Sequence, residues 1–314
     1  MPFGLPTLDS LNTRRQFFAS LAVQEAGTFW KQLAMEVSSR RAAEEYKWLG
    51  ASPAMREWIG GRQGKRPAVQ GITIPNKPFE ASFEIPVEDL DRDATGQINV
   101  RVQDLATRAA MHVDSLLSDA INVSESTVCY DGQFFIDTDH LTGDSGTQSN
   151  DLTTTEVPAS NVVVTTRMTA VEAADVIYQM IAHMFSFKDD AGQPINQNAR
   201  QFAVMASPGH MAGIGAALSA QFLTAGVTNP LLASAFQVVP IINPRLTLTT
   251  KVFVFRIDGA MKPFIYQTEK EPELTIFDRN SEYALDTRHV KAGVDARRNV
   301  GYGMWESAAM VTLT

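Results

Sequence analysis

The stretch CYDGQFFIDTDH, residues 129–140, holds the residues of this sequence best suited to chemistry. It places Asp131, Asp137, Asp139 and His140 around two adjacent phenylalanines. Carboxylates and an imidazole bind divalent metal ions, and they also transfer protons as general acids and bases. The stretch therefore raises two hypotheses: a metal-dependent hydrolase site that uses Asp137, Asp139 and His140, or a polar turn.

The turn hypothesis rests on local chemistry. Asp131-Gly132 is a dipeptide typical of turns, and the run Asp137–His140 can satisfy backbone donors after an aromatic strand. A three-ligand metal site also needs a geometry that adjacent residues seldom provide. We therefore predict a turn, with no catalytic residue, no metal and no cofactor.

The composition is that of a globular protein, and it excludes several classes. The chain has 314 residues, of which 44% are apolar and 20% charged, enough for one large domain or two ordinary ones. No run approaches eighteen apolar residues, so no membrane span is expected, and the N-terminus does not resemble a secretory signal. Cys129 is the only cysteine, which excludes an intrachain disulfide and favours a reducing, intracellular place of synthesis. The net charge of −8 argues against a protein that grips DNA along its length.

Residues 98–123 give the clearest helical pattern. Apolar residues form one stripe, and the charged residues lie mostly off it. At 1.5 Å per residue the helix would run roughly 35–40 Å. His112 sits beside the stripe and is expected to be a packed histidine rather than a metal ligand. The residues of the stripe are Val102, Leu105, Ala109, Val113, Leu116, Leu117 and Ala120.

Residues 55–96 contain two strand-like runs separated by turn residues. In the second run, Phe79, Ala81, Phe83 and Ile85 alternate with polar residues, which is the period of a half-buried strand. The segment has too little apolar material for a core of its own. We therefore predict a long two-stranded arm that is stable only when it packs on something else.

Charge is unevenly distributed along this arm. The charged residues within 56–77 are basic except Glu57, and those within 79–93 are acidic except Arg92. Either both stretches simply face solvent, or the basic stretch docks on the acidic stretch of a second copy of the chain. The second alternative makes these residues candidates for contacts between subunits: Arg62, Lys65, Arg66, Glu80, Glu84, Asp89 and Asp91.

The remaining chain mixes helices and strands. Residues 12–47 suggest an arm with helical character, and Thr169 with Glu172 forms a capping box that opens a helix. Ser207-Pro208 announces another helix, so the pair Gly213-x-Gly215 falls inside a helix and is not a phosphate loop. His210 is expected to be structural. Strand-like runs return from residue 235 onward, and the whole pattern indicates an α+β fold without repeats.

Four passages resemble the Mu-like phage major head subunit family. The resemblance runs in order through residues 44–140 and 261–311, about half of the chain, while residues 141–260 match no motif. The passages are EYKWLGASPAMREWIGGR, IPNKPFEASFEIPVEDLDRDATGQ, CYDGQFFIDTDH, and KPFIYQTEKEPEL followed later by RRNVGYGMWESAAM.

The resemblance implies the tailed-phage capsid fold of the Hong Kong phage type. Its expected parts are an N-terminal arm, an extended β-hairpin loop, a peripheral domain with a long spine helix, and an axial domain. These parts would be residues 1–48 for the arm, 49–97 for the extended loop, 98–160 and 262–314 for the peripheral domain with its spine helix at 98–123, and 161–261 for the axial domain. The last strands would return to the peripheral sheet.

The implied function is that of a major capsid protein, not an enzyme. It would assemble in the host cytoplasm into the icosahedral head shell of a tailed phage or prophage, as pentamers and hexamers around double-stranded DNA. Expected partners are other copies of the chain, a separate scaffolding protein and a portal, with a decoration protein as a further candidate. The DNA would be held loosely and non-specifically, and no membrane is involved. The alternatives are an encapsulin-like compartment shell, which shares the fold, and the metal-dependent hydrolase.

Overall fold

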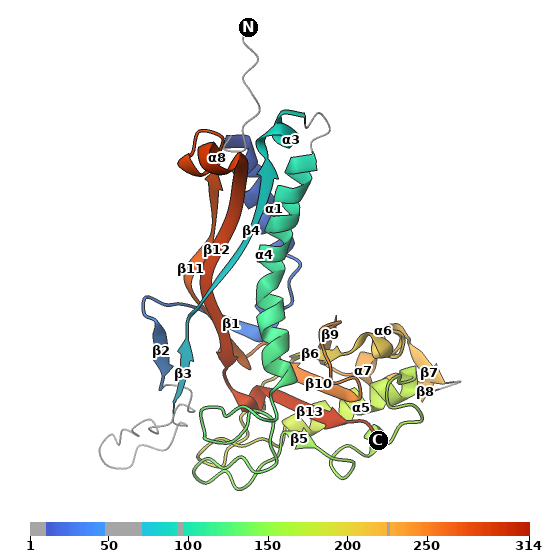
Figure 1. Cartoon of the computed structure of the whole chain (residues 1–314). Coiled ribbons are helices and arrows are strands. Elements are labelled where there is room, and N and C mark those ends of the chain that lie inside the picture. Colours follow the sequence, from blue (N-terminus) through green and yellow to red (C-terminus); the bar gives the residue numbers. More distant parts are fainter. Residues whose placement is uncertain (1–10, 48–70, 93–96, 225–226) are drawn as a thin grey trace.

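The computed structural model describes residues 11–47, 71–92, 97–224 and 227–314. Figure 1 shows an upright part with one sheet and the long helices, and a second part that extends sideways from its base around another sheet. One hydrophobic core runs from the lower end of the first sheet through the second, so the two parts are packed together. Within the described ranges, no helix combines the length and apolarity needed to cross a membrane.

The upright sheet has the strand order β1-β11-β12-β4. β11 and β12 are long antiparallel partners, β4 pairs antiparallel with β12, and the short β1 pairs parallel with β11. The strands are β1 Ala34–Ser38, β4 Lys77–Pro86, β11 Phe264–Phe277 and β12 His289–Tyr302. The burial pattern alternates along most of β12, as expected of a strand with one face on a core.

The predicted helix over residues 98–123 is confirmed as α4, Gln97–Asn122. Its apolar stripe packs on α1, Leu11–Glu25, and on the upright sheet. Phe17 and Leu21 of α1 share one core with this stripe and with Leu274 and Val294 of the long strands. The remaining elements of the N-terminal segment are α2 Trp30–Leu33, β1, and β2 Ala43–Tyr46, so the predicted helical character ends well before residue 47.

The two strand-like runs predicted to form one arm do not pair with each other in the part of that range that the structure describes. β3, Ile72–Pro75, pairs antiparallel with β2, but the second strand-like run is β4, which joins the upright sheet. β12 offers β4 a full row of backbone donors and acceptors, which stabilises the pairing more than a free hairpin would. Phe83 and Ile85 then reach the cores beside α1 and α4.

The second sheet has the strand order β5-β13-β10-β6-β9. β10 pairs antiparallel with β6 and β13, whereas β6 with β9 and β13 with β5 are parallel. The strands are β5 Asp151–Leu152, β6 Gln201–Ala206, β9 Gln237–Ile242, β10 Lys251–Arg256 and β13 Ala308–Thr312. The three central strands are buried almost without alternation, because packed side chains cover both of their faces.

The chain end lies in a different sheet from the one expected. The last strands were predicted to return to the sheet beside the spine helix, but β13 pairs with β10 and β5 of the second sheet. Residues 262–314 therefore contribute strands to both sheets. β12 ends at Tyr302, and the chain then crosses between the sheets through the 3₁₀ turn Trp305–Ser307.

Helices of the second part confirm the local predictions. Thr169 and Glu172 form the complete capping box of α5, Ala170–Met184. Pro208 opens a 3₁₀ turn that leads into α6, Met211–Ser219, although Ser207 makes no capping bond. A Cβ on Gly213 would lie 2.2 Å from the Met168 carbonyl oxygen, so this glycine serves close packing. The remaining short elements are α3 Val87–Arg92, α7 Pro230–Ala233, α8 Glu282–Thr287, β7 Phe222–Thr224, β8 Val227–Thr228 and the 3₁₀ turn Pro158–Ser160.

Candidate functional site

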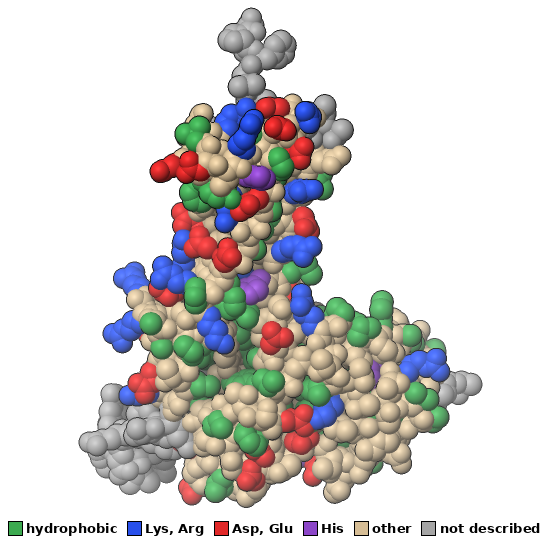
Figure 2. Space-filling model, viewed as in Figure 1, with side chains coloured by type: hydrophobic (Ala, Val, Ile, Leu, Met, Phe, Trp, Pro, Cys, Tyr) green, Lys and Arg blue, Asp and Glu red, His purple; other side chains and the backbone are tan. Residues whose placement is uncertain are grey.

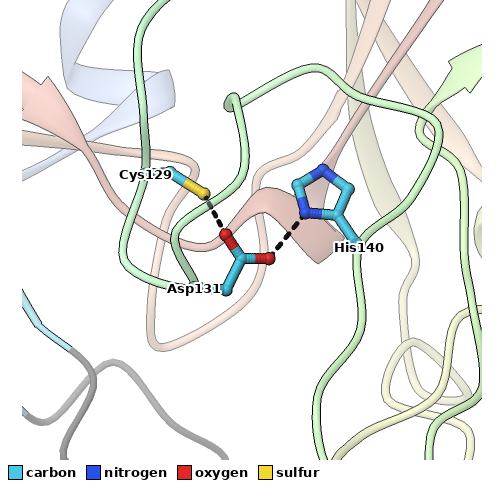
Figure 3. Close-up of side chains that lie close together, drawn as sticks. All are labelled: Cys129, Asp131 and His140. Atoms are coloured by element: carbon cyan, nitrogen blue, oxygen red, sulfur yellow. Dashed lines mark hydrogen bonds and ion pairs between the residues drawn. The ribbon is translucent and has the colours of Figure 1, made fainter.

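The stretch 129–140 forms a turn whose polar side chains point at one another (Figure 3). The Cys129 thiol donates to Asp131 Oδ1 at 2.9 Å, and His140 Nδ1 lies 2.6 Å from Asp131 Oδ2. The other ring nitrogen of His140 lies 3.2 Å from Asn150 Oδ1. The Asn150 amide nitrogen donates to the carbonyls of Phe135 and Trp305, which fixes the amide orientation. Both ring nitrogens of His140 therefore lie within hydrogen-bond distance of side-chain oxygens.

Burial and hydrogen bonding compete at Asp131. Burial raises the pKa of its carboxyl, but the hydrogen bonds from His140 and Cys129 outweigh burial, so the pKa lies below its usual value. Burial first, and the Asp131 charge second, raise the pKa of the Cys129 thiol. The thiol therefore stays protonated and is a poor nucleophile.

The turn is docked on the C-terminal segment. The imidazole of His140 stacks on Trp305 with ring centroids 4.0 Å apart and an interplanar angle of 6°. The phenol of Tyr130 donates to the fully buried carboxyl of Glu306 at 2.8 Å. The stretch thus joins the segment that leads from one sheet to the other, which is a structural role.

The side chains of Asp137, Asp139 and His140, the ligands of the metal hypothesis, do not converge on one point. Asp137 accepts hydrogen bonds from the backbone of Phe134 and Thr138, and the side chain of Asp139 is exposed. In the described part of the chain, the group with metal-ligand types is instead Cys129, Asp131 and His140.

The geometry of that group fits hydrogen bonds better than a metal ion. Two ligands of a tetrahedral zinc lie roughly 3.3–3.5 Å apart when each bond is about 2.1 Å, so 2.6 Å between Asp131 and His140 is too short. Asp131 offers each of its two oxygens to a partner already present. The cluster is built as a closed polar network.

Elemental analysis checks this conclusion. Purified protein is expected to hold no stoichiometric zinc, iron or manganese, because the donor atoms are engaged with one another. The measurement compares native protein with Asp137→Ala/Asp139→Ala/His140→Ala and with Asp131→Asn. One metal ion per chain in native protein that disappears in either variant would contradict the turn.

Glu306 makes the stability depend on pH. Burial raises the pKa of Glu306 to about 7 from 4.5, although the hydrogen bond from Tyr130 and the charge of His140 oppose the rise. Between these values the folded state keeps a proton that the unfolded state loses, so the free energy of unfolding falls as pH increases. Glu306→Gln keeps an acceptor for Tyr130 and cannot ionise. At about pH 8 this variant is expected to be more stable than the parent by up to about 3 kcal/mol.

Denaturant unfolding at pH 5 and at pH 8 measures the effect. The difference between variant and parent should shrink at the lower pH, where the parent keeps its proton. Glu282→Gln, on the exposed side of α8, is the matched control and should show no such dependence. Equal pH slopes for parent and Glu306→Gln would refute the assignment.

The candidate contacts between subunits fall partly outside the described residues. Arg62, Lys65 and Arg66 lie in the range 48–70, which the structure does not describe. Glu84 lies 3.8 Å from Lys291, and Asp91 pairs with Arg279 at 2.5 Å. Glu80 and Asp89 have no cationic partner among the described residues.

Buried charges were the main features that the sequence did not reveal. Arg298, Glu306 and Asp114 are all nearly enclosed, and their partners lie far away in sequence. Asp114 accepts from the backbone of Trp30 at the start of α2, which anchors the N-terminal segment on α4. No local pattern marks such residues, because their partners come from other elements.

Sequence comparison extends the resemblance through most of the chain. A family model described as Mu-like prophage major head subunit gpT matches residues 8–180 and 240–313. The Mu-like prophage FluMu major head subunit of Haemophilus influenzae is 26% identical over 288 residues, which span 91% of this chain and 67% of that protein. The major capsid protein of Escherichia phage Mu is 32% identical over 127 residues, 40% of this chain and 41% of that protein.

Solved structures share the fold. The procapsid of bacteriophage JBD30 has a TM-score of 0.52 at 21% identity, covering 96% of this chain and 76% of that chain. The mature capsid of bacteriophage PhiM1 has a TM-score of 0.57 at 12% identity, covering 91% and 87%. These similarities establish the α+β capsid fold.

Proposed function

This chain belongs to the Mu-like prophage major head subunit family, and we propose that its copies assemble as pentamers and hexamers into an icosahedral shell around double-stranded DNA. The protein is a major capsid protein of the phage virion. The observation that carries the proposal is the family match over residues 8–180 and 240–313, which include the whole upright sheet and part of the second sheet.

Two alternatives are less well supported. An encapsulin-like compartment shell shares the fold, so the fold does not separate it from a phage head, but the family match favours the head subunit. The hydrolase alternative needs Asp137, Asp139 and His140 in one site, and their side chains are directed to different partners. We assign the chain no catalytic residue.

We further propose that the segment around Arg62, Lys65 and Arg66 docks on a neighbouring subunit. Its target is the acidic surface of β4 and α3, where Glu80 and Asp89 have no cationic partner in the described structure. Figure 2 shows that charged side chains gather on the upright part, where this surface lies. Opposite charges on facing surfaces favour correct docking and disfavour wrong partners.

The partners follow from the role in a shell. A separate scaffolding protein would direct curvature, a portal would occupy one vertex, and a decoration protein is a further candidate. The net charge of −8 supports loose and non-specific contact with DNA, because tight binding neutralises many phosphates with Lys and Arg. These partners are proposals for this chain.

The proposal is tested by expressing this chain alone and together with the scaffolding protein of the same phage, and by sedimenting the products. Shells that sediment far ahead of free subunits are expected in at least one of the two conditions. The same particles formed only around a specific protein cargo, in the absence of phage components, would instead favour the compartment shell.

A further inference from the structure

A small cavity opens on the flank of the upright part, between α4, β4 and β12. Its volume is about 200 Å³, and its walls are mainly apolar. Phe79 and Pro272 form walls, and the polar lining includes Arg108, His112 and Arg298. Such a cavity with a few convergent polar groups has the character of a ligand site.

Arg298 is a buried cation without a salt bridge. Only 2% of its surface is exposed, and its Nε has no hydrogen-bond partner. One terminal nitrogen donates to the backbone carbonyl of Ala109 at 2.6 Å. No carboxylate of the described residues lies within ion-pair distance of Arg298. A buried charge in this state lowers stability unless a partner neutralises it.

His112 lines the same cavity and carries a second polar atom without a hydrogen-bond partner in the described part of the chain. Its ring packs edge-on against Phe79 at 4.3 Å, and its Nδ1 is buried without a partner. Burial, and then the positive charges of Arg298 and Arg245, lower the pKa of His112 to about 4. The cavity lining therefore holds two buried nitrogen atoms without a hydrogen-bond partner among the described residues, Nε of Arg298 and Nδ1 of His112.

Two of the other charged residues that line the cavity are already paired. Arg108 pairs with Asp104 at 2.8 Å, and Asp295 pairs with Lys270 at 2.6 Å. Glu80 also lines the cavity and has no cationic partner among the described residues. A single carboxylate fits the volume of about 200 Å³ and the two unpartnered nitrogens, whereas a dianion would meet more repulsion from Glu80.

We propose that this cavity receives one carboxylate side chain from a neighbouring copy of the chain, which pairs with Arg298 and His112. The inference rests on the proposed shell function, because the shell is what brings the second copy to this flank. Arg298 has no salt bridge within the described residues of the free subunit, and the pairing would supply one from the neighbour. Assembly would therefore stabilise the buried guanidinium of Arg298.

Acetate is the probe for the free subunit. Thermal unfolding is expected to shift upward in a saturable manner with sodium acetate, and not with sodium chloride of equal ionic strength, because acetate binds only the folded state. Arg298→Met should remove the shift. Equal curves in acetate and chloride would overturn the proposal. A larger shift with inorganic phosphate than with acetate would assign the cavity to a free phosphate and would likewise overturn it.

Arg298→Met should act with opposite sign in the subunit and in the shell. The free variant should melt at the parent temperature or higher, because an unpaired buried charge is gone. Its shells should form in lower yield and dissociate at lower temperature than parent shells. A loss of melting temperature in the free subunit as large as that in the shell would show that Arg298 serves only the fold.

A second variant tests the cavity in case Arg298→Met does not fold. His112→Phe keeps an aromatic ring on Phe79 and removes only the donor, so it should weaken the acetate shift and the shell while leaving the subunit folded. Glu25 does not line the cavity, so Glu25→Gln should retain a saturable acetate shift. If the parent forms no shell, the proposed function fails. If the parent and both cavity variants form equally stable shells, only this inference fails.

Discussion

A chain that ends at Gly301 is expected to yield no soluble folded subunit. The truncation removes β13, which lies between β5 and β10 in the second sheet, so it leaves open edges on both neighbours. It also removes Trp305, whose side chain is 0% exposed and contacts His140 and Phe187. Both losses fall inside the core that joins the two parts of the molecule.

The single change Trp305→Ala gives the scale of the effect. Truncating a buried tryptophan typically destabilises a protein by about 3–5 kcal/mol, and the whole free energy of unfolding is about 5–15 kcal/mol. Loss of the strand adds to this value. Solubility and cooperative unfolding, measured by circular dichroism, report the result. Val163→Ala, at a side chain that is 88% exposed, is the control and should unfold like the parent. Cooperative unfolding of the truncated chain would show that the terminal strand is dispensable.

Reversal of the basic segment should prevent assembly without affecting the fold. Changing Arg62, Lys65 and Arg66 to Glu should leave the melting temperature of the subunit within about 2 °C, because the proposal has these charges act between subunits and charges outside the packed fold contribute little. The variant segment would meet the acidic surface of a neighbour at every repeated contact in the shell. Its shells should be nearly absent at low salt, and higher salt should restore part of the yield by screening.

A charge swap separates a specific contact from general repulsion. Adding Glu80→Lys and Asp89→Lys to the triple variant should recover much of the yield, whereas adding Lys at the exposed residue Asp144 should not. Sedimentation velocity under matched conditions measures the shell fraction. Full assembly of the triple variant at low salt would show that the basic segment is only a solvated face.

Short-range patterns predicted the elements with the strongest periodicity. α4 could be predicted because its apolar stripe continues from Val102 to Ala120, about five turns, and α5 because its capping box is contained in four residues. The buried position of Trp305 followed from the presence of large side chains near a chain end. The family resemblance provided the capsid fold and function, which no local pattern of this sequence encodes.

Non-local pairing accounts for what the sequence did not predict. β4 alternates as a strand in a free arm would, and only the open edge of β12, more than two hundred residues away, places it in the upright sheet. β13 likewise joins a sheet made of residues from the middle of the chain. The polar turn was predicted, but its closure depends on Asn150, Trp305 and Glu306, which lie outside the stretch.

The most direct test of the shell function is electron cryo-microscopy of particles formed by this chain with its scaffolding protein. The account predicts closed icosahedral shells in which every position is occupied by this chain, arranged in pentamers and hexamers. The map should show α4 and the upright sheet in each subunit, with the segment 48–70 contacting a neighbour near β4. A monodisperse free subunit in all conditions, with or without the scaffolding protein, would contradict the account.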